Sequence, residues 1–324
     1  MMTRAQVVSQ VRNKVRMLHY ALGTEDAYCA WIARYYDFCR GLPRTLTPEE
    51  KAERFLTHLA VVRRLSARTQ NQAFSALLFL YRNVLGKELK GVDALRAKQP
   101  RRERTSPSRE QIRLFRAEVD DTPATPARPI VDLLYGCGLR VSEPLELRVK
   151  DVLWGEGETG HLLLRGAKGG KDRRVPLPRA CVAPLRRQIE AARVLYNHDR
   201  ANAPEVGVTL PHALAMKYPR SPFQWQWFWV FPAPTHCTDP RDGRRVRFHI
   251  LHDNIQRSVQ RAAEKAGLDG LITPHVLRHA YATHSREPIE SLRQLLGHSS
   301  IETTAGYIHP VVDRASNPLD DLLG

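Results

Sequence analysis

The segment that decides the fold runs from Thr273 to Tyr307 and reads TPHVLRHAYATHSREPIESLRQLLGHSSIETTAGY. His275 and Arg278 stand three residues apart, so on a helix both side chains project from one face. Arginine offers a planar, permanently charged fork that matches two phosphate oxygens, and histidine transfers protons near neutral pH. A tyrosine hydroxyl becomes a nucleophile when a base and cations activate it. His298 lies 20 residues after Arg278, and Tyr307 lies 29 residues after Arg278. This joint spacing indicates chemistry on a phosphate.

Each of these groups alone is more simply explained as a helix-surface pair or as packing, but together they resemble the C-terminal box of the tyrosine recombinases. That resemblance implies two further groups upstream, an arginine in a Gly-Leu-Arg-x-Ser-Glu box and a lysine at the tip of a β-hairpin. Both are present. Residues 136–145 read GCGLRVSEPL and contain Arg140 and Glu143, and residues 165–175 read RGAKGGKDRRV and contain Lys168.

The resemblance also implies how DNA is cut. Tyr307 attacks a phosphorus atom, which leaves a 3′-phosphotyrosine link and a free 5′-hydroxyl. Arg140 and Arg278 hold the non-bridging oxygens and stabilise the charge that develops on them. Lys168 protonates the departing 5′-oxygen. Strand exchange reverses the attack with the 5′-hydroxyl of another strand.

The remaining roles follow from the same family. His275 accepts the tyrosine proton, His298 hydrogen-bonds the phosphate, and Glu143 orients His275. The phosphotyrosine conserves the bond energy, so the resemblance implies no cofactor and no metal. It also implies four protomers on two DNA sites, with the tail 311–324 docking on a neighbouring protomer.

Composition agrees with a nucleic-acid partner. Lys and Arg exceed Asp and Glu by 16 (50 against 34), and such an excess favours a polyanion, with binding that weakens as salt rises. Five cysteines without a paired framework suit a reducing compartment. The sequence has neither an apolar signal core nor a membrane-spanning run. We therefore expect a bacterial cytoplasmic protein that associates with the nucleoid and not with a membrane.

The fold class expected is mainly α with a small antiparallel β-sheet, arranged as a two-domain DNA clamp. Residues 1–95 form a helical N-terminal core-binding domain, in which Thr24, Thr47 and Ser66 are candidate N-caps. Residues 96–107 are a basic linker with two prolines. Residues 108–324 form the catalytic domain. Its expected elements are helices at 109–119, 130–135 and 180–200, and strands at 161–165 and 173–177 around a glycine-rich turn.

Candidate DNA contacts lie in three of these segments. The front of the third helix carries Arg and amide side chains that could reach phosphates or base edges, although a solvated helix face explains them equally well. The linker and the lysine hairpin carry further cations. The candidates are Arg68, Gln70, Asn71, Arg101, Arg102, Lys171 and Arg173.

An insertion at about 206–248 holds the sequence QWQWFWVFP from 224 to 232. Tryptophans at alternate positions are typical of one packed face of a strand, or of a platform on which an unpaired base stacks. The insertion resembles the extra segment of the integron integrases, whose attachment site is bound as a folded single strand with bulged bases. Trp227 is then the candidate for stacking on such a base, and His249 and His252 are weaker candidates for the same surface.

Other interpretations remain open. His236 and Cys237, with the two histidines that follow, suggest zinc, but their spacing is looser than zinc sites use. The segment 285–291 is shorter than in most relatives, so a homologue that binds DNA without cutting it is one alternative. A recombinase of double-stranded sites, of phage or chromosome-resolving type, is a second, and a type IB topoisomerase is a third.

Overall fold

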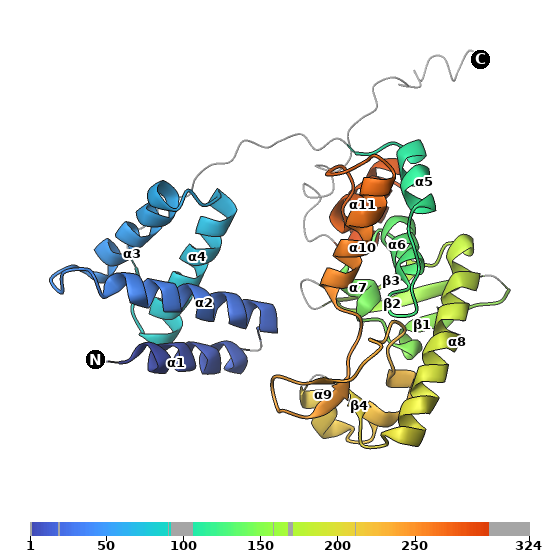
Figure 1. The fold of residues 1–324 in the computed structure, drawn as a ribbon, viewed down its shortest axis with the longest axis horizontal. Coiled ribbons are helices and arrows are strands. Elements are labelled where there is room, and N and C mark those ends of the chain that lie inside the picture. Colours follow the sequence, from blue (N-terminus) through green and yellow to red (C-terminus); the bar gives the residue numbers. More distant parts are fainter. Residues whose placement is uncertain are drawn as a thin grey trace, which may run out of the picture. The chain divides into compact units, whose positions relative to one another are not determined.

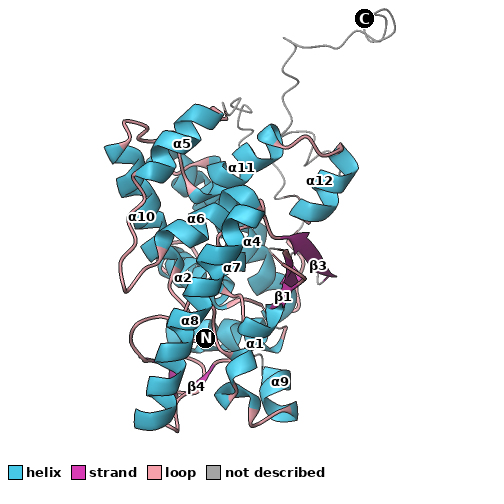
Figure 2. Cartoon of the chain, turned by 90° about the vertical axis from the view of Figure 1, so that its right-hand side faces the viewer, coloured by secondary structure: helices cyan, strands magenta, loops and turns pink. Residues whose placement is uncertain are grey.

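The computed structural model describes residues 2–18, 20–89, 91, 106–157, 159–167, 171–210 and 212–297. The chain divides into two compact units, residues 1–103 and 104–324. Helices dominate both units, and strands are few and short (Figure 2). The expected fold class, mainly α with a small antiparallel sheet, is confirmed.

The first unit is helical throughout its described elements (Figure 1). The α-helices are α1 Arg4–Met17, α2 Leu22–Cys39, α3 Pro48–Thr57 and α4 Ala67–Phe79, and π-helical turns His58–Val62 and Leu80–Val84 extend α3 and α4. Aliphatic and aromatic side chains from every one of these elements build one buried core. At its centre the hydroxyls of Tyr35 and Tyr81 are hydrogen-bonded at 2.7 Å.

Local capping signals explain where two of these helices begin. Thr47 forms a complete capping box with Glu50 in front of α3, and the Ser66 side chain accepts from the Thr69 backbone N–H in front of α4. Both predicted starts are confirmed. The predicted start at Thr24 is wrong, because α2 begins at Leu22 and Thr24 lies in its first turn.

The second unit places helices around a three-stranded antiparallel sheet. Its first elements are α5 Arg109–Ala117, α6 Ala127–Gly136, α7 Ser142–Leu145, a 3₁₀ turn Val149–Asp151, β1 Val152–Trp154, β2 Gly160–Ala167, β3 Lys171–Pro176 and α8 Arg179–Asn202. The strand order is β1-β2-β3, with Leu162 of β2 opposite both Val152 and Val175. These three side chains face the main core, so the sheet packs on the helices through its alternate residues.

The second half of this unit contains the insertion and the three helices that follow it. Its elements are β4 Gly207–Val208, α9 His212–Lys217, 3₁₀ turns Ser221–Phe223 and Trp225–Trp227, β5 Cys237–Thr238, β6 Arg245–Arg247, α10 His252–Lys265, α11 Pro274–His284 and α12 Ile289–Leu296. The strands form a second small sheet in the order β4-β6-β5, parallel in its first pair and antiparallel in its second. Among the described residues, no helix is both long and apolar enough to cross a lipid bilayer.

The tryptophan-rich stretch is not a strand. Trp225 and Trp227 lie in a 3₁₀ turn, and Trp229 makes a single bridge to Arg148. Trp229 and Phe228 are buried in a small cluster with Ala192 and Val208, whereas Trp225 and Trp227 are only partly buried against it. The alternation predicts a strand face, but residues 225 and 227 lie in a 3₁₀ turn, and the buried pair 228 and 229 follows that turn.

Candidate active site

Arg278 is delivered by α11 into the interior of the second unit. Thr273 caps this helix and Pro274 occupies its first turn, so the His-x-x-Arg motif sits in the first two turns. The Arg278 side chain is only 2% exposed. Its Nη1 donates to the Gly138 carbonyl at 2.7 Å and its Nη2 to the Leu296 carbonyl at 2.6 Å. His275 lies on the exposed side of the same helix.

Arg140 arrives from the turn between α6 and α7. Gly138 adopts φ +61° in this turn, a conformation that residues with a Cβ rarely adopt, and the Tyr281 ring packs directly against it. The Arg140 backbone N–H donates to Glu143 Oε2 at 2.7 Å, and its Nη1 donates to Oε1 at 2.9 Å. Its Nη2 donates to the Gly297 carbonyl at 3.1 Å. The sequence Gly-Leu-Arg-x-Ser-Glu therefore folds into a turn in which Glu143 binds both the backbone and the side chain of Arg140 and so orients its guanidinium group.

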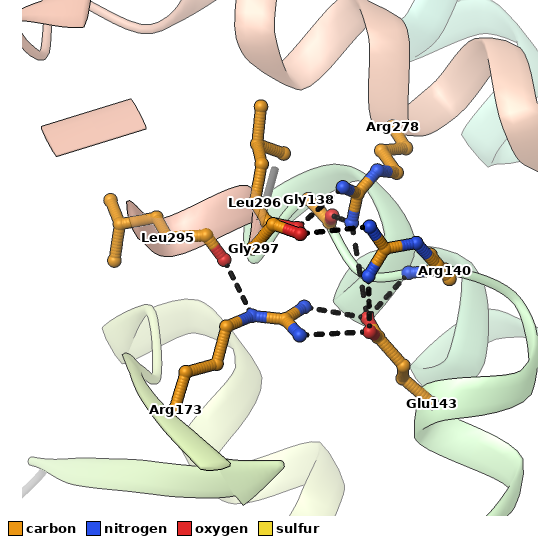
Figure 3. Close-up of polar contacts among 8 residues, drawn as sticks. All are labelled: Gly138, Arg140, Glu143, Arg173, Arg278, Leu295, Leu296 and Gly297. Carbon is orange, nitrogen blue, oxygen red and sulfur yellow. Dashed lines mark hydrogen bonds and ion pairs between the residues drawn. The ribbon is translucent and has the colours of Figure 1, made fainter. Parts of the chain in front are cut away.

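A third arginine, Arg173 of β3, completes the cluster (Figure 3). Its Nη1 and Nη2 donate to the two oxygens of Glu143 at 2.9 and 2.7 Å, and its Nε donates to the Leu295 carbonyl at 2.8 Å. Its side chain is 9% exposed. Arg173 therefore makes its described contacts inside the protein, and its predicted DNA contact stays a prediction.

The three arginines converge on the C-terminal end of α12. They bind three consecutive carbonyls, those of Leu295, Leu296 and Gly297, as Figure 3 shows. These carbonyls have no partner within the helix, and the helix dipole makes this end negative, so guanidinium groups stabilise it. Pro288 is the N-cap residue of α12 after the short connection from α11, and the Leu296 carbonyl at the end of this helix accepts from Arg278. His298 is the next residue along the chain.

Glu143 is the common partner of this arginine cluster. Burial opposes its ionisation, but the hydrogen bonds and charge of Arg173, together with Arg140 and Arg278, outweigh burial and hold the pKa of Glu143 below its ordinary value. Arg278 Nη1 lies 3.9 Å from Glu143 Oε2. The carboxylate therefore organises cations, and its predicted support of His275 stays a prediction.

Several predicted residues lie outside the described part of the chain. These are Lys168, His298, Tyr307, Arg101, Arg102 and the tail 311–324. Lys171 begins β3, and only its place in the strand is described. The described site therefore consists of Arg140, Arg278, Glu143 and Arg173, with His275 exposed on α11.

The candidate DNA face of α4 is only partly as predicted. Arg68 and Asn71 are exposed near its first turn. Gln70 is buried, and its amide donates to the Leu65 carbonyl at 2.7 Å, so its predicted contact with DNA stays a prediction. This bond fixes the turn in front of α4, where Arg63 and Arg64 are exposed.

Trp227 is surrounded by cations. The Lys150 ammonium lies 2.7 Å from the centroid of its ring, and the Arg148 guanidinium lies 5.8 Å from it. Burial lowers the pKa of Lys150 to about 8. Arg148 donates to the carbonyls of Trp227 and Thr209, both at 2.6 Å, and so fixes the insertion to the segment before β1. Sequence reasoning missed Arg148 and Lys150, because their partners lie about 60–80 residues away and leave no periodic signal.

The histidines of the insertion have structural surroundings. His236 Nε2 lies 2.9 Å from Asp199 Oδ1, and Arg247 donates to both oxygens of the same carboxylate. His249 stacks on Phe248, with ring centroids 4.0 Å apart, and its burial lowers its pKa, whereas His252 is exposed at the start of α10. Within the described ranges, no three His, Cys, Asp or Glu side chains converge as metal ligands would.

Comparison with known proteins agrees with this geometry. Residues 8–91 match the description "Phage integrase, N-terminal SAM-like domain", and residues 108–314 match "Phage integrase family". The chain belongs to the phage integrase family of tyrosine recombinases. It is 40% identical over 319 residues to an integrase/recombinase of Escherichia coli, which covers 94% of this chain and 89% of the relative. It is also 29% identical to the tyrosine recombinase XerA of Thermococcus kodakarensis, across 88% of this chain and 84% of the relative.

Solved structures share the fold. A XerH recombinase bound to its difH substrate matches with TM-score 0.62 and 19% identity, and covers 95% of this chain and 81% of that one. A lambda integrase dimer bound to a core site matches with TM-score 0.59 and 16% identity, across 95% and 97% of the two chains. As a family member, the chain is a tyrosine site-specific recombinase that cleaves and religates DNA.

Proposed function

We propose that this recombinase is an integron integrase, which inserts and excises gene cassettes and uses one attachment site as a folded single-strand hairpin. The observation that carries the proposal is the insertion. It holds Trp227 at a partly exposed position, with Lys150 against its ring and the buried Arg148 guanidinium 5.8 Å from the ring centroid. An aromatic ring among cations suits a base that has left the duplex, together with its phosphates. Exposed His252 and partly buried His249 flank the surface in the same proposal.

The chemistry follows the roles implied by the family. Tyr307 attacks the phosphorus, Lys168 protonates the leaving 5′-oxygen, His275 accepts the tyrosine proton, and His298 hydrogen-bonds the phosphate. Arg140 and Arg278 stabilise the negative charge that develops on the non-bridging oxygens.

The arginine cluster supports this scheme. Arg140 and Arg278 donate to helix-end carbonyls that DNA phosphate oxygens would replace as acceptors, so the fork geometry is already formed. We propose that protomers act as a tetramer on two sites, with the tail 311–324 in contact with a neighbour. Arg68 and Asn71 contact the DNA from α4 in the same proposal.

The first test uses a labelled hairpin that carries an integron-type attachment site and a nick that traps the covalent complex. We expect an adduct that survives denaturation with the wild-type protein and none with Tyr307→Phe. Tight binding without an adduct from the wild type would overturn the catalytic roles in favour of a DNA-binding homologue.

A second arm separates hairpin from duplex recognition. We expect Trp227→Ala to weaken binding to a hairpin with a bulged base by about 1–3 kcal/mol, with little change for the same hairpin without the bulge. Trp154→Ala, on β1 and also partly exposed, is the matched control and leaves both affinities unchanged.

The second candidate is a recombinase of double-stranded sites, which the similarity to the XerA protein favours. It predicts an adduct on duplex DNA and none on the hairpin. That result would overturn the integron assignment and leave the recombinase chemistry standing.

A further inference from the structure

Arg173 makes contacts with two separate parts of the site. Its fork binds both oxygens of Glu143, and its Nε binds the Leu295 carbonyl at the end of α12. The next residue, Arg174, is on the opposite face of β3 and is exposed. The two adjacent arginines of β3 therefore have different environments: Arg173 contacts the other residues of the site, whereas Arg174 is exposed on the opposite face.

The position of Arg173 matters for the charge on Glu143. The carboxylate also binds the backbone N–H and Nη1 of Arg140 and lies near Arg278. A carboxylate paired only with these two arginines would attract them away from a phosphate, since opposite charges in a buried site interact strongly. Arg173 donates to both oxygens of Glu143, on the side of the carboxylate away from Arg140. Nη2 of Arg140 is then directed toward the C-terminal end of α12.

Gly297 leaves space for the Arg173 side chain. It has φ +63°, and a Cβ at this position would lie 3.1 Å from Nη1 and 3.3 Å from Cζ of Arg173. The Arg173 side chain therefore packs closely against Gly297. The contact joins β3, the turn that carries Arg140, and the last turn of α12.

We propose that Arg173 is a positioning residue for strand cleavage: it holds Glu143 and the end of α12 so that Arg140 and Arg278 meet the scissile phosphate. Arg173 itself touches no DNA. The inference rests on the proposed roles of Arg140 and Arg278.

The first experiment compares binding with cleavage for the full-length protein on a trapped, nicked attachment site. We expect Arg173→Ala to bind with wild-type affinity and to cleave about 10²-fold more slowly, as a misplacement near 1 Å does. Arg174→Ala removes the same charge one residue away and is expected to cleave at the wild-type rate. Thermal unfolding of each variant shows that the compared proteins are folded. If Arg173→Ala is unstable, Arg173→Lys replaces it. That variant keeps the charge without the fork, and an intermediate loss of rate is expected.

The second experiment is a double-mutant cycle with Glu143→Gln. If Arg173 acts through Glu143, its removal should slow the Glu143→Gln protein far less than it slows the wild type, since residues in one network are not additive. Multiplicative losses would overturn the proposal, because a residue that only stabilises the fold gives them. A loss of DNA affinity equal to the loss of rate would also overturn it. Absence of any adduct from the wild type would instead refute the proposed function.

Discussion

Gly138 is the residue that allows Arg140 and Arg278 to come close together. Its carbonyl accepts from Arg278, and two residues later the chain reaches Arg140. A Cβ on Gly138 would lie 2.3 Å from Cδ1 of Tyr281 and 2.9 Å from Cδ2 of Leu296. The close approach explains why this turn needs glycine both for its backbone angle and for space.

We expect Gly138→Ala to lower the free energy of unfolding by roughly 2–5 kcal/mol, from about 1–2 for the left-handed backbone and about 1–3 for overpacking. Gly157→Ala is the control, because Gly157 has φ +63° with nothing within 4 Å of its Cβ position. It should cost only the backbone part. Urea denaturation of both variants measures the difference, and equal losses would contradict the steric explanation.

The contacts of a basic or amide side chain are hard to predict from the sequence alone. Arg173 and Gln70 are candidates for DNA contact by chemical type, yet within the protein Arg173 binds Glu143 and Leu295, and Gln70 binds Leu65. A basic or amide side chain has the same pattern in the sequence whether it faces water or a buried carbonyl. Arg140 and Arg278 could be assigned to one site from the sequence because their motifs follow the spacing of the family that they resemble.

At the scale of elements, starts of helices were predictable where a side chain caps them. Thr47 and Ser66 make the expected cap bonds. Thr24 failed because α2 begins without a side-chain cap, and Glu25 in its first turn is instead bound by Arg16 of α1, at 2.9 Å from both nitrogens. The contact between helices, which no local pattern encodes, thus ties this end of α2 to α1.

Gly297 is expected to have a larger effect on function than on stability. Gly297→Ala should cost about 1–2 kcal/mol of folding free energy for the left-handed backbone, and it should also displace Arg173 and slow cleavage by about 10²-fold. Gly267→Ala, just after the end of α10, has φ +68° and open space around its Cβ position. It should lose similar stability and keep the cleavage rate. Melting curves and single-turnover cleavage of the two variants distinguish the effects, and equal cleavage rates would refute the coupling of α12 to Arg173.

At the scale of the whole molecule, the positive charge is unequally distributed. Residues 1–103 contain 19 Lys and Arg against 9 Asp and Glu, and residues 104–324 contain 31 against 25. The smaller unit therefore carries +10 of the +16 net charge. Three of the arginines counted in this charge, Arg63, Arg64 and Arg68, are exposed around the turn in front of α4. Because counterion release from DNA scales with the phosphates neutralised, this unit should supply most of the salt dependence of binding.

Substitutions of the exposed arginines near α4 test this charge distribution. We expect Arg63→Gln and Arg68→Gln each to reduce the slope of log K against log salt by about one, the amount that one phosphate contact contributes. Affinity for specific and unrelated duplexes should fall by similar factors, because a phosphate contact carries no sequence information. Arg68→Lys keeps the charge and should keep the slope. Binding titrations over a range of salt concentrations measure all three variants. An unchanged slope in Arg68→Gln would place that side chain away from the DNA, whereas a loss confined to one sequence would assign it to a base edge.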